Sequence, residues 1–214
     1  MKLPGTTQIA GRKTVNDWES AKLILVDFKN VKEWENAFND FFKARLNDRY
    51  LEPIKAIRDN GGYTGEGFSI MTIICSLVEF LESSWQGINY RFRRKSDPPL
   101  TADEYSASGL VFESFLTNRE PFKQYFTSSD ASEFYTKVRC GLLHEARTKG
   151  KWTIWGNSGN KILFKKNVNE MIVYRDQFYD AVIEYIDINY KQELLSSDDR
   201  KKAFIKKFDA LCAE

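Results

Sequence analysis

The chain has little of the chemistry on which most hydrolases depend. It contains one histidine, His144, and three cysteines that stand far apart and form no C-x-x-C pair. A metal site built from several histidines of one chain is therefore excluded. A disulfide framework or a zinc site made from these thiols is not expected either. Reduced cysteines suit the cytoplasm, which is where we expect the protein to act.

Motifs for nucleotide phosphates and for serine or zinc hydrolases are also missing. The sequence has no G-x-x-x-x-G-K-[ST] loop, no G-x-G-x-x-G between a strand and a helix, no H-E-x-x-H and no G-x-S-x-G. The glycines Gly61, Gly62, Gly65 and Gly67 are not followed by a lysine at the phosphate-loop spacing. We therefore expect no cofactor and no metal.

The sequence lacks a long hydrophobic run and a strong excess of one charge. Its most apolar run, Ile70–Leu81, has about twelve residues, whereas a helix needs about 20 to cross a bilayer. Residues 1–16 are basic but contain no apolar segment, so we expect neither a secretory signal nor a membrane partner. Lys and Arg together number 32 and Asp and Glu 30, a net charge of +2. Any affinity for nucleic acid then has to come from local clusters.

Helical periodicity dominates the 214 residues that are present. Apolar residues recur at three- and four-residue steps through Val31–Asn60, which predicts a helix that breaks or bends near Pro53. Further helices are predicted at Phe68–Trp85, Thr101–Phe115 and Glu133–Ala146, in a long segment that contains Ile172, Phe178, Val182, Tyr185 and Ile186, and at Asp198–Leu211.

One segment has the alternation of strands instead. Lys151–Trp155 and Lys161–Phe164 alternate on either side of Gly156–Asn160, which predicts a β-hairpin at about 151–165. We therefore predict a mainly all-α protein, a helical bundle with a small β-hairpin inserted after the fourth helix. Residues 1–30 are predicted to be an N-terminal extension and residues 31–214 a single domain.

The clearest functional signal lies in the fourth predicted helix, where Arg139 and His144 stand five residues apart. This R-x-x-x-x-H arrangement, late in a helical bundle, resembles the signature of the HEPN superfamily. Its members are small helical bundles, and many are metal-independent endoribonucleases of toxin–antitoxin, phage-defence or RNA-processing systems. The resemblance covers about Val31–Tyr190. It implies a HEPN-like fold with Arg139 and His144 as catalytic residues, RNA as substrate, a homodimer, and an antitoxin or defence-operon protein as a further partner.

The two residue types suit RNA cleavage without a metal, in which the 2′-OH attacks the adjacent phosphorus. Histidine titrates near neutral pH and moves protons, and arginine stays charged and can bond two phosphate oxygens. Five residues along an α-helix rotate two side chains by about 140° and separate them by about 7.5 Å, so they do not share one face. A symmetric dimer that brings two such helices together would supply two copies of each residue.

Other residues are candidates for holding RNA. Cys140 follows the motif arginine, where the family often has Asn, Asp or His, so the resemblance implies a substrate-holding position there. Arg147 and Lys149 would extend a positive rim around the site. A further cluster mixes cations with Tyr90 and Phe92, a composition suited to single-stranded nucleic acid, although a solvated loop explains it as well. Its cations are Arg91, Arg93, Arg94 and Lys95.

A structural interpretation of the same motif stays open. Arg139 can pair with Glu79 or Glu82 of the preceding long helix, because a buried charge needs a partner. His144 can simply occupy the favourable C-terminal end of its helix. The protein would then be a non-catalytic HEPN-like module that binds a protein partner, a nucleotide or RNA. Trp152 and Trp155 are expected to pack against the bundle, and a dimer interface or a stacked base are the alternative uses.

Overall fold

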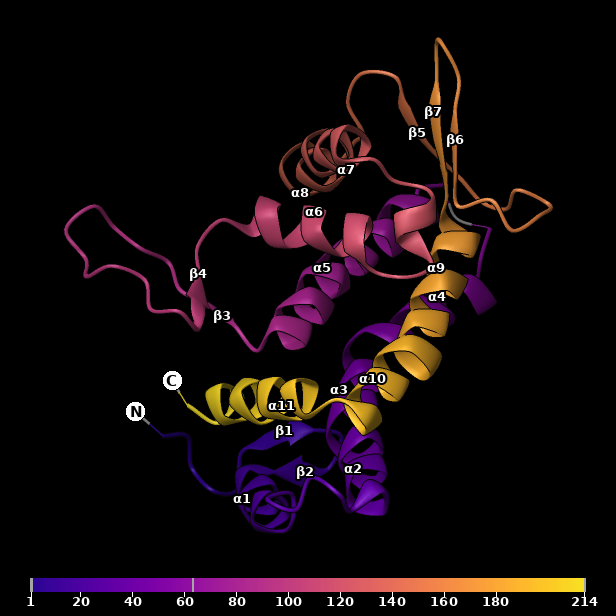
Figure 1. Cartoon of the computed structure of the whole chain (residues 1–214). Helices are drawn as coiled ribbons and strands as arrows, with labels where there is room; N and C mark the ends of the chain where they lie inside the picture. The colour runs from indigo at the N-terminus through magenta and orange to yellow at the C-terminus, as the bar shows by residue number, and fades with distance from the viewer. Residues whose placement is uncertain (1, 63, 214) are drawn as a thin grey trace. The chain divides into compact units, whose positions relative to one another are not determined.

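The computed structural model describes residues 2–62 and 64–213 and confirms a mainly helical chain (Figure 1). It divides into two compact units. Unit 1 contains Met1–Pro53, Ser83–Ala107 and Ile188–Glu214, and unit 2 contains Ile54–Glu82 and Ser108–Asp187. Three helical elements contain a unit boundary: α4 (Glu52–Asp59), α5 (Glu66–Gln86) and η5 (Tyr185–Tyr190).

Unit 1 is built from short helices, most of which have buried aromatic residues. Its strands pair as β1 with β2, antiparallel, and β3 with β4, parallel. Its elements are β1 (Gln8–Ala10), β2 (Lys13–Thr14), α1 (Val15–Ile24), α2 (Val31–Ala37), η1 (Phe38–Lys43), α3 (Ala44–Leu46), η2 (Asn47–Leu51), β3 (Asn89–Tyr90), β4 (Glu104–Tyr105), α10 (Lys191–Ser196) and α11 (Asp198–Leu211). Residues 1–30, predicted as an extension, contribute fully buried Trp18, whose indole N–H donates to Asp209 at 2.9 Å.

Two predicted helix boundaries, near Pro53 and at Thr101, differ from those in the structure. Of the break or bend predicted near Pro53, the break is absent, because the π-helical turn η2 passes directly into α4. A wider turn relieves the clash between a proline ring and the carbonyls of the preceding turn. The helix predicted from Thr101 begins only at Ser108. The Thr101 N–H does donate to Glu104 at 2.8 Å, but Glu104 and Tyr105 form strand β4.

Unit 2 carries the predicted motif. Its elements besides parts of α4, α5 and η5 are α6 (Ser108–Asn118), η3 (Phe122–Gln124), α7 (Ser128–Phe134), η4 (Tyr135–Arg139), α8 (Cys140–Glu145), β5 (Trp152–Trp155), β6 (Phe164–Lys166), β7 (Met171–Tyr174) and α9 (Arg175–Glu184). Phe134 is the centre of its core. Four rings lie 5.4–5.9 Å from the Phe134 ring, those of Phe112, Phe126, Trp152 and Phe178.

The predicted hairpin at 151–165 is wrong. The three strands lie in the order β5-β7-β6, with β5 parallel and β6 antiparallel to β7, so the hairpin joins β6 and β7 (Figure 1). All four residues of β7 are buried, so this central strand shows no alternation, and Ile172 in it was predicted to be helical. The loop after β5 is held by Gln177 instead of a hairpin turn, because its side-chain oxygen accepts from the Ser158 N–H at 3.0 Å.

Helix α5 is a long helix with a strongly apolar central part. Among the described residues it alone is long and apolar enough to cross a membrane by length and composition, and 56% of its most apolar window is buried inside the protein. A core helix passes the same test, so the finding is weak evidence for a membrane span. The predicted helix Phe68–Trp85 is confirmed, with Gly87 following its last residue.

Gly87 generates a prediction about the stability of unit 1. Its φ is +70°, and a Cβ there would lie 2.8 Å from the Ala203 Cα. Gly87→Ala should lower the free energy of unfolding by about 2–4 kcal/mol, from backbone strain plus overpacking, as measured by urea denaturation. Gly150→Ala is the matched control, because its φ of +61° lies in the same left-handed region while no described residue lies within 4 Å of the added Cβ. Equal losses in the two variants would contradict the close approach to Ala203.

Candidate functional site

Arg139 and His144 lie on one continuous helix, Ser128–Glu145, which we call the site helix. Thr127 caps its start: the Asp130 N–H donates to the Thr127 hydroxyl, and that hydroxyl donates to the Asp130 carboxylate at 2.7 Å. The π-helical turn η4 lies in its middle and ends at Arg139. Such turns often accompany functional sites, but η1, η2 and η5 are π-helical as well, so the turn alone marks no site.

Arg139 is held against α5 by an ion pair. Its Nη2 lies 3.3 Å from Glu79 Oε2, and both side chains are largely covered, with 21% and 15% of their surface exposed. The guanidinium also lies over the Tyr135 ring, 5.3 Å from its centroid. Burial alone would lower the pKa of Arg139, but Tyr135, Glu79 and Cys140 favour the charged form, and the pKa is raised. Arg139 is therefore a fixed, permanently charged group.

The other carboxylate named as an alternative partner, Glu82, has a different cation. Arg119 donates from Nε to Glu82 Oε2 at 2.8 Å and from Nη2 to Oε1 at 3.0 Å, and the Ser114 hydroxyl donates to Oε1 at 2.8 Å. Glu82 is completely buried, so the forked arginine compensates the cost of burying its charge. Arg119 could not be recognised as this partner from the sequence, because Glu82 lies 37 positions away from it.

His144 faces solvent in the last turn of the site helix. It is exposed, and no hydrogen bond or ion pair joins its ring to the residues that the structure describes. The chain then folds back closely, because a Cβ on Gly141 would lie 2.5 Å from the Arg147 carbonyl oxygen. Gly141 thus allows a close approach of backbone segments. Arg139 is directed to α5 and His144 to solvent, so one chain does not bring the two side chains together.

The predicted RNA-holding residues near the motif are already paired. Arg147 lies 3.2 Å and Lys149 2.5 Å from the carboxylate of Glu145, so the two cations share one acidic partner. Cys140 is half-buried beside Tyr135 and Arg139. Burial, followed by the neighbouring Cys140, raises the pKa of Tyr135, while Arg139 opposes the rise.

The second basic cluster belongs to unit 1, in the long loop between β3 and β4 (Figure 1). Arg91 connects the two ends of this loop. Its Nε lies 2.8 Å from Glu104 Oε1, and its Nη2 donates to the carbonyl oxygens of Pro98 and Pro99. Three further side chains of the cluster, together with Phe92, are exposed: Arg93, Arg94 and Lys95. This cluster and the pair Arg139 and His144 thus belong to different units.

The two tryptophans of β5 differ. Trp152 is buried, and its ring packs against Phe134 and stacks on Phe164 at 5.1 Å, as expected of a packing residue. Trp155 is 53% exposed.

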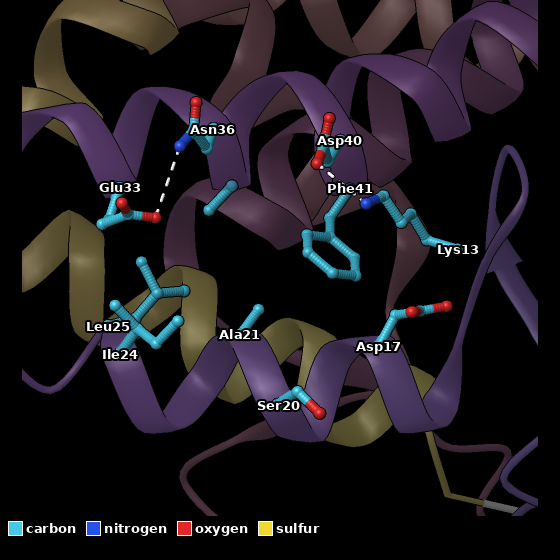
Figure 2. Close-up of a pocket in the computed structure, with 11 residues that line it drawn as sticks. Lys13, Asp17, Ser20, Ala21, Ile24, Leu25, Glu33, Asn36, Asp40 and Phe41 are labelled. Carbon is cyan, nitrogen blue, oxygen red and sulfur yellow. Dashed lines mark hydrogen bonds and ion pairs between the residues drawn. The ribbon is translucent and has the colours of Figure 1, made fainter.

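Unit 1 contains a groove of about 210 Å³ that is poorly suited to RNA. Figure 2 shows it between α1 and the helix that runs from α2 into η1, with Ala21 and Phe41 on its floor. Its charged side chains are three carboxylates and one lysine, which lies 3.0 Å from one of them: Asp17, Glu33, Asp40 and Lys13. Such a groove repels phosphate. Two further cavities, in unit 2, are lined by neither Arg139 nor His144. Within residues 2–62 and 64–213, no group of three or more His, Cys, Asp or Glu could hold a metal ion.

The environment of Cys140 predicts selective thiol chemistry. Burial raises the pKa of Cys75 to about 12 and that of Cys212 to about 11, and both are covered, whereas Cys140 is half-exposed. A thiol reagent should modify Cys140 first in the folded protein and all three cysteines after unfolding, as mass spectrometry of the digested protein would show. Rapid modification of Cys75 without unfolding would contradict the packing of α5 against the site helix.

No protein-family model, no curated protein and no solved structure matches this chain. The function therefore has to be inferred from the site helix and its surroundings alone.

Proposed function

We propose that this chain is a metal-independent endoribonuclease of the HEPN type that works as a homodimer, with Arg139 and His144 as its catalytic residues. One observation carries the proposal: a single helix holds an arginine fixed by Glu79 and Tyr135 and, five residues later, a histidine whose ring is exposed and unengaged. A fixed cation and an accessible proton carrier are the two groups that cleavage through the 2′-OH needs.

The proposed reaction is a transesterification. A base takes the proton of the 2′-OH, the 2′ oxygen bonds to phosphorus, and the bond from phosphorus to the 5′ oxygen breaks while an acid protonates the leaving oxygen. The products are a 2′,3′-cyclic phosphate and a 5′-OH. His144 of one copy would act as base and His144 of the other as acid, because one imidazole cannot hold both protonation states at once. Arg139 would stabilise the charge that develops on the phosphoryl oxygens.

Exposed apolar side chains around the site helix support the homodimer. Leu143 in α8 is 55% exposed and directly precedes His144. Leu110 in α6 is 70% exposed and directly follows Gly109, where an added Cβ would lie 3.1 Å from the Tyr135 ring. We assign these two leucines to the apolar contact of the proposed interface, in which a second copy would cover them. A second copy docked there would bring two histidines to one cleft.

The remaining proposed roles follow from charge. Arg147 and Lys149 would bind RNA phosphates in competition with Glu145, and Cys140 would hold substrate beside Arg139. The exposed cations of the β3–β4 loop would bind RNA more remotely. The setting would be the cytoplasm, in RNA processing or in a toxin–antitoxin or phage-defence system with a neutralising partner protein.

A second candidate function is supported by the ion pair itself. A carboxylate 3.3 Å from Arg139 weakens the attraction of that guanidinium for phosphate, as expected of a residue that only joins the site helix to α5. The protein would then be a non-catalytic HEPN-like module that binds a protein, a nucleotide or RNA. Folded wild-type homodimer that cleaves no RNA, in the assay below, would favour this function.

The first test is RNA cleavage by purified variants. His144→Ala should slow cleavage by about 10²–10⁴-fold, the usual contribution of general acid–base catalysis. Arg139→Lys should also slow it, because lysine keeps a charge beside Glu79 but loses the planar fork that binds two phosphate oxygens. Cleavage should persist in EDTA and leave 2′,3′-cyclic phosphate ends, detected by their resistance to ligation and by mass spectrometry.

The matched control for these variants is Lys137→Ala, which removes an exposed cation from the same helix. It should leave both the fold, seen by circular dichroism, and the chemical step nearly unchanged. Equal cleavage by wild type and His144→Ala would show that a contaminating nuclease or another residue is responsible, and the proposal would fail.

The second test concerns the dimer. Leu143→Glu should convert the dimer to a monomer, because it places a charge in the proposed apolar interface, and cleavage should fall with dimer content. Light scattering across a concentration series gives the mass. Circular dichroism should show an unchanged fold because Leu143 is exposed in the single chain, while the unfolding midpoint should lose its dependence on protein concentration along with the dimer. Leu23→Glu, at a site 76% exposed in unit 1, is the control and should leave the mass unchanged. Monomeric wild-type protein with full activity would overturn the composite site.

A further inference from the structure

Unit 2 contains a cleft that is separate from the two predicted catalytic residues. It lies where β5 ends and where α5 and α9 begin, three segments that are far apart in the sequence. Its volume is about 270 Å³, slightly below the range of pockets for drug-sized ligands, so it suits one planar ring system. Its lining consists of Gly65–Phe68, Ile154–Gly156 and Arg175.

Two aromatic rings stand at this cleft without ring partners among the described residues. Trp155 is 53% exposed and Phe68 is 40% exposed, and both line the cleft. The other tryptophan of the same strand, Trp152, is fully engaged in the core. Large aromatic rings that face a cavity in place of the core are available to stack on a ligand.

Two glycines, Gly65 and Gly67, line the cleft together with the two aromatic residues. A Cβ on Gly67 would lie 3.3 Å from both Ile154 Cγ2 and Arg175 Nη1, so the wall there is tightly built. Gly65 has a φ of +99°, and no described residue lies within 4 Å of the position of its Cβ, so that side is open within the described part of the chain. A flat ligand can therefore approach backbone on one side while aromatic faces remain available to it.

The two charged side chains that line the cleft, Arg175 and Glu66, neutralise one another. Arg175 pairs with Glu66, and its Nε lies 3.6 Å from Asp176 Oδ1. Glu66 also accepts from the Gly62 N–H at 3.0 Å. A neutralised arginine offers little to a free phosphate, whereas donors and acceptors at the edge of an aromatic slot suit the polar edge of a heterocycle.

We propose that this cleft binds a nucleobase, stacked on Trp155 and Phe68. The base belongs to single-stranded RNA or to a free nucleotide, and in the first case the inference rests on the proposed function, since it names how the substrate is held. Base–aromatic stacking tolerates any sequence, because every base has a π-face. The cleft would thus hold an unpaired base while the phosphates remain in solvent or on the cations.

The test is binding of a fluorescently labelled oligoadenylate to the full-length His144→Ala variant, which keeps the RNA intact. Trp155→Ala and Phe68→Ala should each weaken binding about 5–150-fold, the range for one stacked base. Trp155→Phe should retain most of the affinity. Gly67→Ala should weaken binding because its methyl group displaces Ile154 or Arg175. Val168→Ala, at a site 90% exposed that does not line the cleft, is the control and should bind normally.

Two further ligands decide the chemistry. An abasic oligonucleotide should bind as weakly as the Trp155→Ala variant binds oligoadenylate, and tight abasic binding would overturn the proposal. AMP should quench the fluorescence of the exposed Trp155. If AMP binds as tightly as the oligonucleotide, the ligand is a free nucleotide, and if it binds far more weakly, the ligand is RNA. Base binding through Trp155 in a chain that cleaves nothing would support this cleft and refute only the nuclease function.

Discussion

Burial of Phe134 is the interaction on which unit 2 depends. Its ring touches side chains from α6, from the segment after η3, from β5 and from α9, so a single residue joins the helices to the sheet. Loss of such a ring typically costs about 3–5 kcal/mol. Phe134 also lies in the last turn of α7, five residues before Arg139. Once its ring is buried, the rotation of the site helix is set, and the side of the helix that Arg139 occupies is turned to Glu79.

That fixed rotation explains why one chain does not form a complete site. Residues five positions apart on a helix point in different directions, so a helix that buries Arg139 against α5 necessarily presents His144 elsewhere. The structure has this outcome: an arginine paired within the unit and a histidine in solvent. Catalysis by both residues then requires a second chain, whereas a structural role for Arg139 requires nothing more. The geometry of one chain therefore fits the structural role of Arg139 directly and the proposed catalytic role only through a second copy.

The sequence predicted local structure well and pairing poorly. The helix at Phe68–Trp85 followed from an apolar run with a glycine after it, both of which are local signals. The sequence predicts a hairpin between residues 151–155 and 161–164, which is wrong because β5 pairs in parallel with β7. A parallel pair has no tight turn between its strands, so the sequence contains no local signal for this contact. Arg139 and Glu79 are 60 positions apart, so the sequence could name Glu79 and Glu82 as partners without choosing between them. Arg119 decides which of the two glutamates pairs with Arg139, because its guanidinium donates two hydrogen bonds to the carboxylate of Glu82.

Charge pairing also limits how this protein could hold RNA. The segment after the site helix is basic by composition, yet Glu145 forms ion pairs with both Arg147 and Lys149. In the β3–β4 loop, Glu104 forms an ion pair with Arg91. Each phosphate contact made by these cations has to compete with an existing carboxylate, so its net contribution is small. With a net charge of only +2, long-range attraction adds little. Stacking on an exposed ring does not depend on charge, and Trp155 offers it in unit 2 beside the paired cations.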